Sequence, residues 1–172
     1  MKILILYEHP DNCGSLSLQG HLLYKGLLEN GIDCRACHYK QRKKEKEWYF
    51  KIFKPDAVIG LGWWVDTPNL VKGPLEFGLQ PVPWLLADGW VANYHQILGN
   101  LPLVLTTSQW VKETYQRDGV DVKNFEVLHV GYDPKKFKPI PKDHPVIKEI
   151  RNMYGIKDHE KIILTAGGDA TS

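Results

Sequence analysis

Short apolar segments recur along the first 130 residues and predict the strands of a buried sheet. The segment from Ile3 to Tyr7 has no polar position, as expected for a strand that is covered on both faces of a parallel sheet. Five further strands are predicted at 32–39, 57–61, 82–86, 103–106 and 125–128. Each is only a few residues long, which is typical of strands in compact α/β domains.

Stretches of helical character separate these strands. Leu16, Leu23 and Leu27 recur at near-helical spacing in a helix that Asn30-Gly31 would end. A second helix is expected at about 91–98. This alternation of apolar strands and helices predicts an α/β fold, a doubly wound parallel sheet of the Rossmann-like kind with right-handed crossovers.

Two positions have the form of helix N-caps. Ser108 precedes a predicted helix at 109–117, and its hydroxyl is of the type that accepts from a first-turn N–H. Thr67 stands before Pro68, which suits the first position of a helix. Both caps would follow strands directly.

The pattern changes after residue 130. A Pro- and Lys-rich stretch at 131–145 is expected to be a linker, followed by a short helix and a new apolar strand at 162–166. That strand runs into Gly167-Gly168, where a helix ordinarily follows to cover the strand. We therefore expect residues 1–130 to form one domain and 146–172 to be the start of a truncated second domain.

Composition narrows the class of protein. With 43% hydrophobic and 24% charged residues, the 172-residue chain is ordinary for a globular protein with one core. A net charge of +2 does not suggest a nucleic-acid partner. Three cysteines are too few for a disulfide framework, which fits a reducing cytosol, and no apolar run reaches the ~20 residues of a membrane span.

Cys34 and Cys37 have the C-x-x-C spacing of metal sites. No second pair follows them, and on a strand these two side chains would point to opposite faces. We therefore expect no metal site.

Four loops should lie at the carboxyl ends of the strands, where ligands bind in such sheets: 9–15, 62–67, 87–93 and 106–108. In the first loop, Gly14 and Ser15 open a helix, whose free N–H groups suit a phosphate. Neither a dinucleotide fingerprint nor a P-loop motif occurs. A plain tight turn is the alternative.

Aromatic residues accompany a carboxylate in two of these loops. Asp88 lies beside Trp90, and Trp64 lies near Asp66. Aromatic faces with a carboxylate are good contacts for a sugar ring. The alternative is an Asp that caps the next helix and aromatic rings that belong to the core.

The segment from Lys40 to Phe53 combines basic and aromatic residues and could touch a membrane from outside. Glu45 and Glu47 interrupt its basic run. A solvated charged face followed by core aromatics is therefore expected instead.

Three segments carry a resemblance to a known family. They are the strand at 1–6 leading to Gly14, the segment 105–111, and Val130-Gly131-Tyr132-Asp133 with Phe137 and Pro139. With these the whole chain resembles the amino-terminal half of a GT-B-fold retaining glycosyltransferase of family 4, which includes glycogen-synthase-like and mannosyltransferase-like enzymes.

The resemblance implies roles for ten residues. Asp88 would be catalytic, and the donor phosphates would contact Gly14, Ser15, Gly167 and Gly168. The acceptor would contact His9, Trp64, Asp66, Trp90 and Ser108. The donor would be a UDP- or GDP-linked sugar and the acceptor a sugar or a lipid-linked sugar, with no cofactor, metal or nucleic acid.

These expectations define the leading hypothesis: the acceptor-side domain of a cytoplasmic glycosyltransferase, with peripheral membrane contact left open. Because the resembled family grips its nucleotide mainly with the second domain, the chain alone should be inactive and its partner would be that domain. The alternatives are a stand-alone Rossmann-like binding module without catalysis and a self-contained flavodoxin-like or nucleotide-dependent enzyme.

Overall fold

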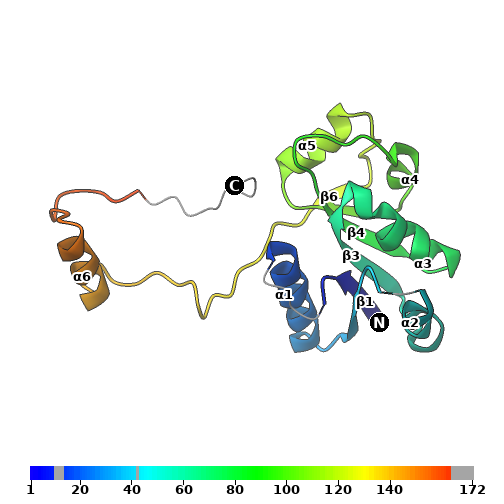
Figure 1. The fold of residues 1–172 in the computed structure, drawn as a ribbon, viewed down its shortest axis with the longest axis horizontal. Helices are drawn as coiled ribbons and strands as arrows, with labels where there is room; N and C mark the ends of the chain where they lie inside the picture. The colour runs from blue at the N-terminus through cyan, green and yellow to red at the C-terminus, as the bar shows by residue number, and fades with distance from the viewer. Residues whose placement is uncertain (10–13, 42, 164–172) are drawn as a thin grey trace. The chain divides into compact units, whose positions relative to one another are not determined.

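The computed structural model describes residues 1–9, 14–41 and 43–163, and its sheet confirms the expected fold class (Figure 1). Six parallel strands lie in the order β2-β1-β3-β4-β5-β6. They are β1 (Lys2–Tyr7), β2 (Asp33–His38), β3 (Ala57–Trp63), β4 (Pro81–Leu86), β5 (Val104–Thr106) and β6 (Phe125–Val127). The chain changes its direction of winding at β1, since β2 and β3 flank that strand.

Helical segments connect the strands. They are α1 (Ser15–Glu29), α2 (Lys43–Trp48), η1 (Tyr49–Phe53), η2 (Trp64–Asp66), η3 (Pro68–Lys72), α3 (Gly73–Glu76), α4 (His95–Gly99), α5 (Gln109–Arg117) and α6 (Pro145–Met153). No helix in the described part of the chain has both the length and the apolar character of a membrane span.

The sheet has a hydrophobic core on each face. On one face, Ile5, Tyr7 and Trp84 pack with Leu23 and Leu27 of α1. The opposite face carries the larger core, in which strand residues meet side chains from η1, η3, α4 and α5: Leu4, Leu6, Val58, Leu85, Phe50, Leu70, Leu98, Val111 and Tyr115. Alternate residues of β1 therefore serve different cores, as the period of two along a strand requires. The sheet is therefore doubly wound, with helices packed on both of its faces.

Several predicted boundaries are confirmed and others are wrong. Helix α5 begins after Ser108, whose Oγ accepts from the Val111 N–H at 3.2 Å. Helix α4 begins at His95 instead of residue 91, because Tyr94 has a φ of +65°, which is incompatible with a right-handed helix.

Thr67 stands where the sequence predicts it, directly before Pro68 at the start of η3, but its side chain makes no capping hydrogen bond. Thr67 already has helical backbone angles, and its hydroxyl donates to the Trp64 carbonyl oxygen at 2.6 Å. The turn is instead closed one residue earlier by Asp66, whose Oδ2 accepts from the Trp63 N–H at 3.0 Å.

The basic segment forms α2 and the π-helical turn η1. Phe50 and Phe53 are buried, as predicted for core aromatics, whereas Trp48 is 53% exposed. Lys46 is buried despite its charge, and its Nζ donates to the Tyr39 carbonyl oxygen and to Asn69 Oδ1. Burial lowers the pKa of this lysine. The expectation of a fully solvated charged face is therefore wrong at Lys46.

The chain divides by its own contacts into one compact unit, residues 1–133, and a second unit that begins at Pro134. In the second unit, α6 buries none of its residues. Of the strand predicted at 162–166, Ile162 and Ile163 are not in a strand, and the remainder, with Gly167 and Gly168, lies outside the described residues.

Cys34 and Cys37 lie on opposite faces of β2, as predicted, since each belongs to a different core. Burial raises the pKa of the Cys34 thiol to about 11 and that of Cys37 to about 12. Across the residues that the structure describes, no group of three His, Cys, Asp or Glu side chains could hold a metal ion.

The raised thiol pKa values predict that both cysteines are unreactive in the folded protein. In a Cys13→Ser variant at pH 8, we expect a disulfide reagent such as DTNB to label neither thiol until urea unfolds the chain, because the thiolate is the nucleophile. The two thiols should also make stability fall with rising pH above 9, where unfolded thiols ionise and folded ones do not. Rapid labelling of the native protein would contradict this.

Candidate functional site

The carboxyl ends of all six parallel strands meet at one edge of the sheet, and the described parts of the four predicted loops follow that edge, with residues 10–13 of the first loop outside the described residues. Two hollows open there, formed by different loops. We call them the aromatic pocket, lined by Trp63, Trp64, Val65, Asp88 and Trp90, and the apolar cleft, lined by Ser15, Leu16, Gln19, Leu61, Trp84, Leu86, Thr107 and Val130.

The aromatic pocket has a volume of about 310 Å³ and joins the loops after β3 and β4. The rings of Trp64 and Trp90 meet edge to face, with centroids 5.2 Å apart and planes at 66°. Trp90 is 57% exposed, and Trp64 is half-buried. Asp88 is exposed at the same pocket. The pocket thus offers indole rings and a carboxylate together.

The turn after β3 presents Trp64 to this pocket. Asp66 is 9% exposed, and its contact with the Trp63 N–H closes the turn. A side chain at Gly62 would place its Cβ 2.8 Å from Asp66 Oδ2 and 2.9 Å from Leu70 Cδ1, so the absence of a side chain here leaves room for the carboxylate to reach the backbone. In this structure the Asp66 carboxylate supports the turn and does not line the pocket.

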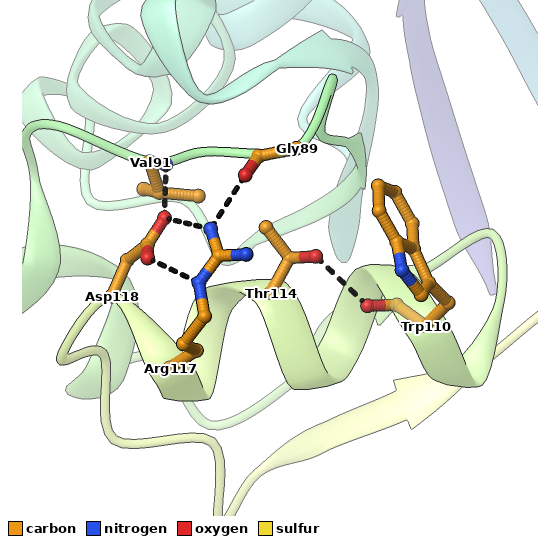
Figure 2. A network of polar contacts seen from close by, with 6 residues as sticks. All are labelled: Gly89, Val91, Trp110, Thr114, Arg117 and Asp118. Atoms are coloured by element: carbon orange, nitrogen blue, oxygen red, sulfur yellow. Dashed lines mark hydrogen bonds and ion pairs between the residues drawn. The ribbon is translucent and has the colours of Figure 1, made fainter.

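The loop after β4 is held by the end of α5 (Figure 2). Arg117 Nη2 donates to the Gly89 carbonyl oxygen at 2.5 Å, and the Val91 N–H donates to Asp118 Oδ2 at 2.6 Å. Arg117 also donates to both oxygens of Asp118, at 2.8 and 3.0 Å. The hydrogen bond from Arg117, followed by that from Val91, lowers the pKa of Asp118.

The apolar cleft, about 160 Å³, lies at the beginning of α1. Gly14 is the N-cap of α1 and makes no side-chain cap, and the first turn contains no acidic residue. Gln19 bridges to the chain after β6: its Nε2 donates to the Gly131 carbonyl oxygen at 2.9 Å and its Oε1 accepts from the Gly131 N–H at 2.8 Å. Polar groups therefore rim an apolar hollow.

The structure brings only some of the predicted site residues together. Trp64, Asp88 and Trp90 share the aromatic pocket, while Ser15 lines the apolar cleft. Ser108 caps α5, and His9 Nδ1 lies 2.9 Å from Tyr7 Oη. Gly167 and Gly168 lie outside the described residues.

Sequence reasoning did not single out Gln19, Thr107, Arg117 or Asp118. Arg117 is 28 positions from Gly89, and no periodicity or motif signals that pairing. Thr107 belonged to a loop already predicted to lie at the edge, so its position could have been inferred.

Comparison with solved structures identifies proteins of similar fold. Three crystal structures of Anabaena Alr3699/HepE match 90% of this chain and 50% of the HepE chain. The complex with UDP and glucose gives a TM-score of 0.54 at 13% identity. The UDP-glucose complex gives 0.54 at 14%, and the UDP complex gives 0.53 at 14%.

No protein-family model matches the sequence, and no curated protein matches it. The comparison therefore shows a common fold at low sequence identity, and the chain spans about half the length of HepE.

Proposed function

We propose that this chain is the acceptor-side, amino-terminal domain of a retaining glycosyltransferase that transfers a sugar from a nucleotide-sugar donor. One observation carries this proposal: 90% of the chain matches half of HepE, a protein crystallised with UDP-glucose. In the resembled GT-B family the nucleotide is bound mainly by the second domain, and we propose that this domain corresponds to the part of HepE that the chain does not match. The position of the aromatic pocket, at the edge of the sheet where ligands bind, supports the acceptor role.

The chemistry assigns different tasks to the two halves. In sugar transfer the bond from the anomeric carbon to the diphosphate breaks as an acceptor oxygen bonds to that carbon, and the acceptor proton passes to the departing phosphate. The catalyst must stabilise the positive charge that develops on the sugar at that carbon and the negative charge that develops on the departing diphosphate, and it must hold the acceptor hydroxyl in place. Asp88 is the carboxylate proposed to face the positively charged sugar.

The start of α1, beside the apolar cleft, is proposed to contact the donor. The first-turn N–H groups of α1, beginning at Ser15, would face the donor diphosphate, since a helix of 15 residues carries partial positive charge at its start. The chain alone would bind acceptor weakly and would not turn over. The donor would be UDP-linked or GDP-linked, with no metal required.

A second candidate is a stand-alone binding module. The observation that favours it is that residues 1–133 form a compact unit with a core on both faces of the sheet. Such a unit could bind a sugar or another ring in the aromatic pocket without catalysis.

A transfer assay separates the two candidates. We would compare the 172-residue chain with the same protein extended through the coding sequence that follows Ser172, using UDP-glucose and GDP-mannose with a panel of sugar acceptors. Transfer by the extended protein and none by the chain is the expected result. Sugar binding by the chain without transfer by the extended protein would instead support the binding module.

A further inference from the structure

The loop that carries Trp90 has little internal support. Residues 87–94 contain no helix or strand, and Gly89 has a φ of +87°. Trp90 is largely exposed between Gly89 and the buried Val91. An indole on such a loop would sample many orientations. The entropy lost when binding orders the indole would lower the affinity of any ligand that stacks on it.

Contacts from α5 remove that freedom at the two peptides that flank Trp90. Arg117 donates to the carbonyl oxygen of Gly89, which precedes Trp90, and Asp118 accepts from the N–H of Val91, which follows it. Arg117 also donates to Asp118, so the two side chains form one network (Figure 2). Charge-assisted bonds with this paired geometry are more directional than a single contact. The backbone of Trp90 is thereby tied at both sides to one rigid helix.

We propose that Arg117 and Asp118 are positioning residues that hold Trp90 as a fixed stacking surface for a pyranose ring of the acceptor. Because this role requires the aromatic pocket to bind the acceptor, it rests on the proposed function. The ring's C–H face would lie on an indole and its hydroxyls would donate to Asp88. A purely aliphatic ligand would leave that carboxylate without a donor.

The first experimental arm measures Trp90 without any ligand. The chain is labelled with 5-fluorotryptophan, and the Trp90 signal among the six tryptophans is assigned with a Trp90→Phe variant. In the wild type the edge-to-face contact with Trp64 should displace the Trp90 fluorine shift. In Arg117→Met the signal should move toward that of exposed fluorotryptophan and sharpen, and Arg117→Lys should restore part of the displacement.

The matched control is Lys123→Met. Lys123 pairs with Asp121 at 3.1 Å, and both side chains are more than half exposed. Both Met variants should melt within roughly 3 °C of the wild type, since Lys123→Met removes one exposed ion pair and Arg117→Met removes one exposed ion pair and one exposed hydrogen bond to Gly89. Only Arg117→Met should alter the Trp90 signal.

The second arm uses maltose and cellobiose as probes. Arg117→Met should weaken binding about fivefold, the cost of ordering one side chain. In the extended protein, the same substitution should raise the acceptor KM by about that factor and leave the UDP-glucose KM unchanged.

Each outcome decides a separate point. An unchanged Trp90 signal in Arg117→Met would overturn the positioning role, and so would a changed signal with unchanged sugar affinity. If no sugar perturbs Trp90 in the wild type, the acceptor assignment of the pocket is overturned, while the ligand-free arm still decides whether Arg117 holds the loop.

Discussion

Gly20→Ala is expected to destabilise the chain by about 3 kcal/mol, the upper part of the usual range for overpacking a core. Gly20 lies in α1 directly over the ring of Tyr7 in β1. A Cβ at this position would lie 2.3 Å from two ring atoms of Tyr7 and 2.7 Å from its Cβ. Real carbon atoms do not approach so closely, so something must move.

Neither partner can move cheaply. Tyr7 is 1% exposed, its Cβ is fixed to a central strand, and its Oη contacts His9. Relief therefore requires α1 to shift away from the sheet, which would open the core formed by Ile5, Leu23 and Leu27. The effect should appear as a lower urea midpoint with an unchanged m-value.

Gly26→Ala is the matched control in the same helix. A Cβ at Gly26 meets nothing within 4 Å, so the substitution removes only the conformational penalty of glycine. We expect a gain of about 0.5–1 kcal/mol. The opposite signs test the close packing of α1 on β1, and two small effects of equal sign would contradict it.

Asp88→Asn is expected to lower kcat for sugar transfer by about a hundredfold in the extended protein, the usual loss when one preorganised electrostatic contact is removed. The substitution keeps the shape of the side chain and removes its negative charge. Because the nucleotide is proposed to be bound mainly by the second domain, and Asp88 is not among the residues proposed to contact the donor phosphates, the KM for UDP-glucose should change little. Folding should be unaffected, since Asp88 is exposed.

Asp33→Asn serves as the control for that measurement. Asp33 is also exposed, but it begins β2 and so lies at the opposite edge of the sheet. It should transfer sugar at the wild-type rate. Full activity in Asp88→Asn would remove Asp88 from the catalytic machinery and leave it as a pocket-lining residue at most.

The residues of the aromatic pocket could be predicted from the sequence, whereas the contacts that support its Trp90 loop are seen only in the tertiary structure. Trp64, Asp88 and Trp90 could be predicted to meet, because each follows a strand of one parallel sheet and the strand ends share an edge. Their support by Arg117 could not be predicted. That contact depends on how α5 packs across the loop, and a single arginine at a helix end carries no signal of its distant partner.

Two predictions made from local sequence, the start of α4 and the side-chain cap at Thr67, differ from the structure because of the backbone conformation there. Tyr94 adopts a left-handed conformation that delays α4, and Thr67, although it precedes Pro68 at the start of η3, has a helical backbone and makes no side-chain cap. In both places the sequence pattern is compatible with more than one backbone conformation, so the pattern alone does not select between them.

The sequence by itself determined the doubly wound sheet, the succession of its six strands along the chain, the Ser108 cap and the opposite faces of Cys34 and Cys37. These features follow from hydrophobic periodicity and local hydrogen bonding, which neighbouring residues specify. Only the tertiary structure decided the contact of Gly20 with Tyr7, the burial of Lys46 and the Arg117–Asp118 support of Trp90. Those depend on distances between elements far apart in the chain, which pattern alone does not encode.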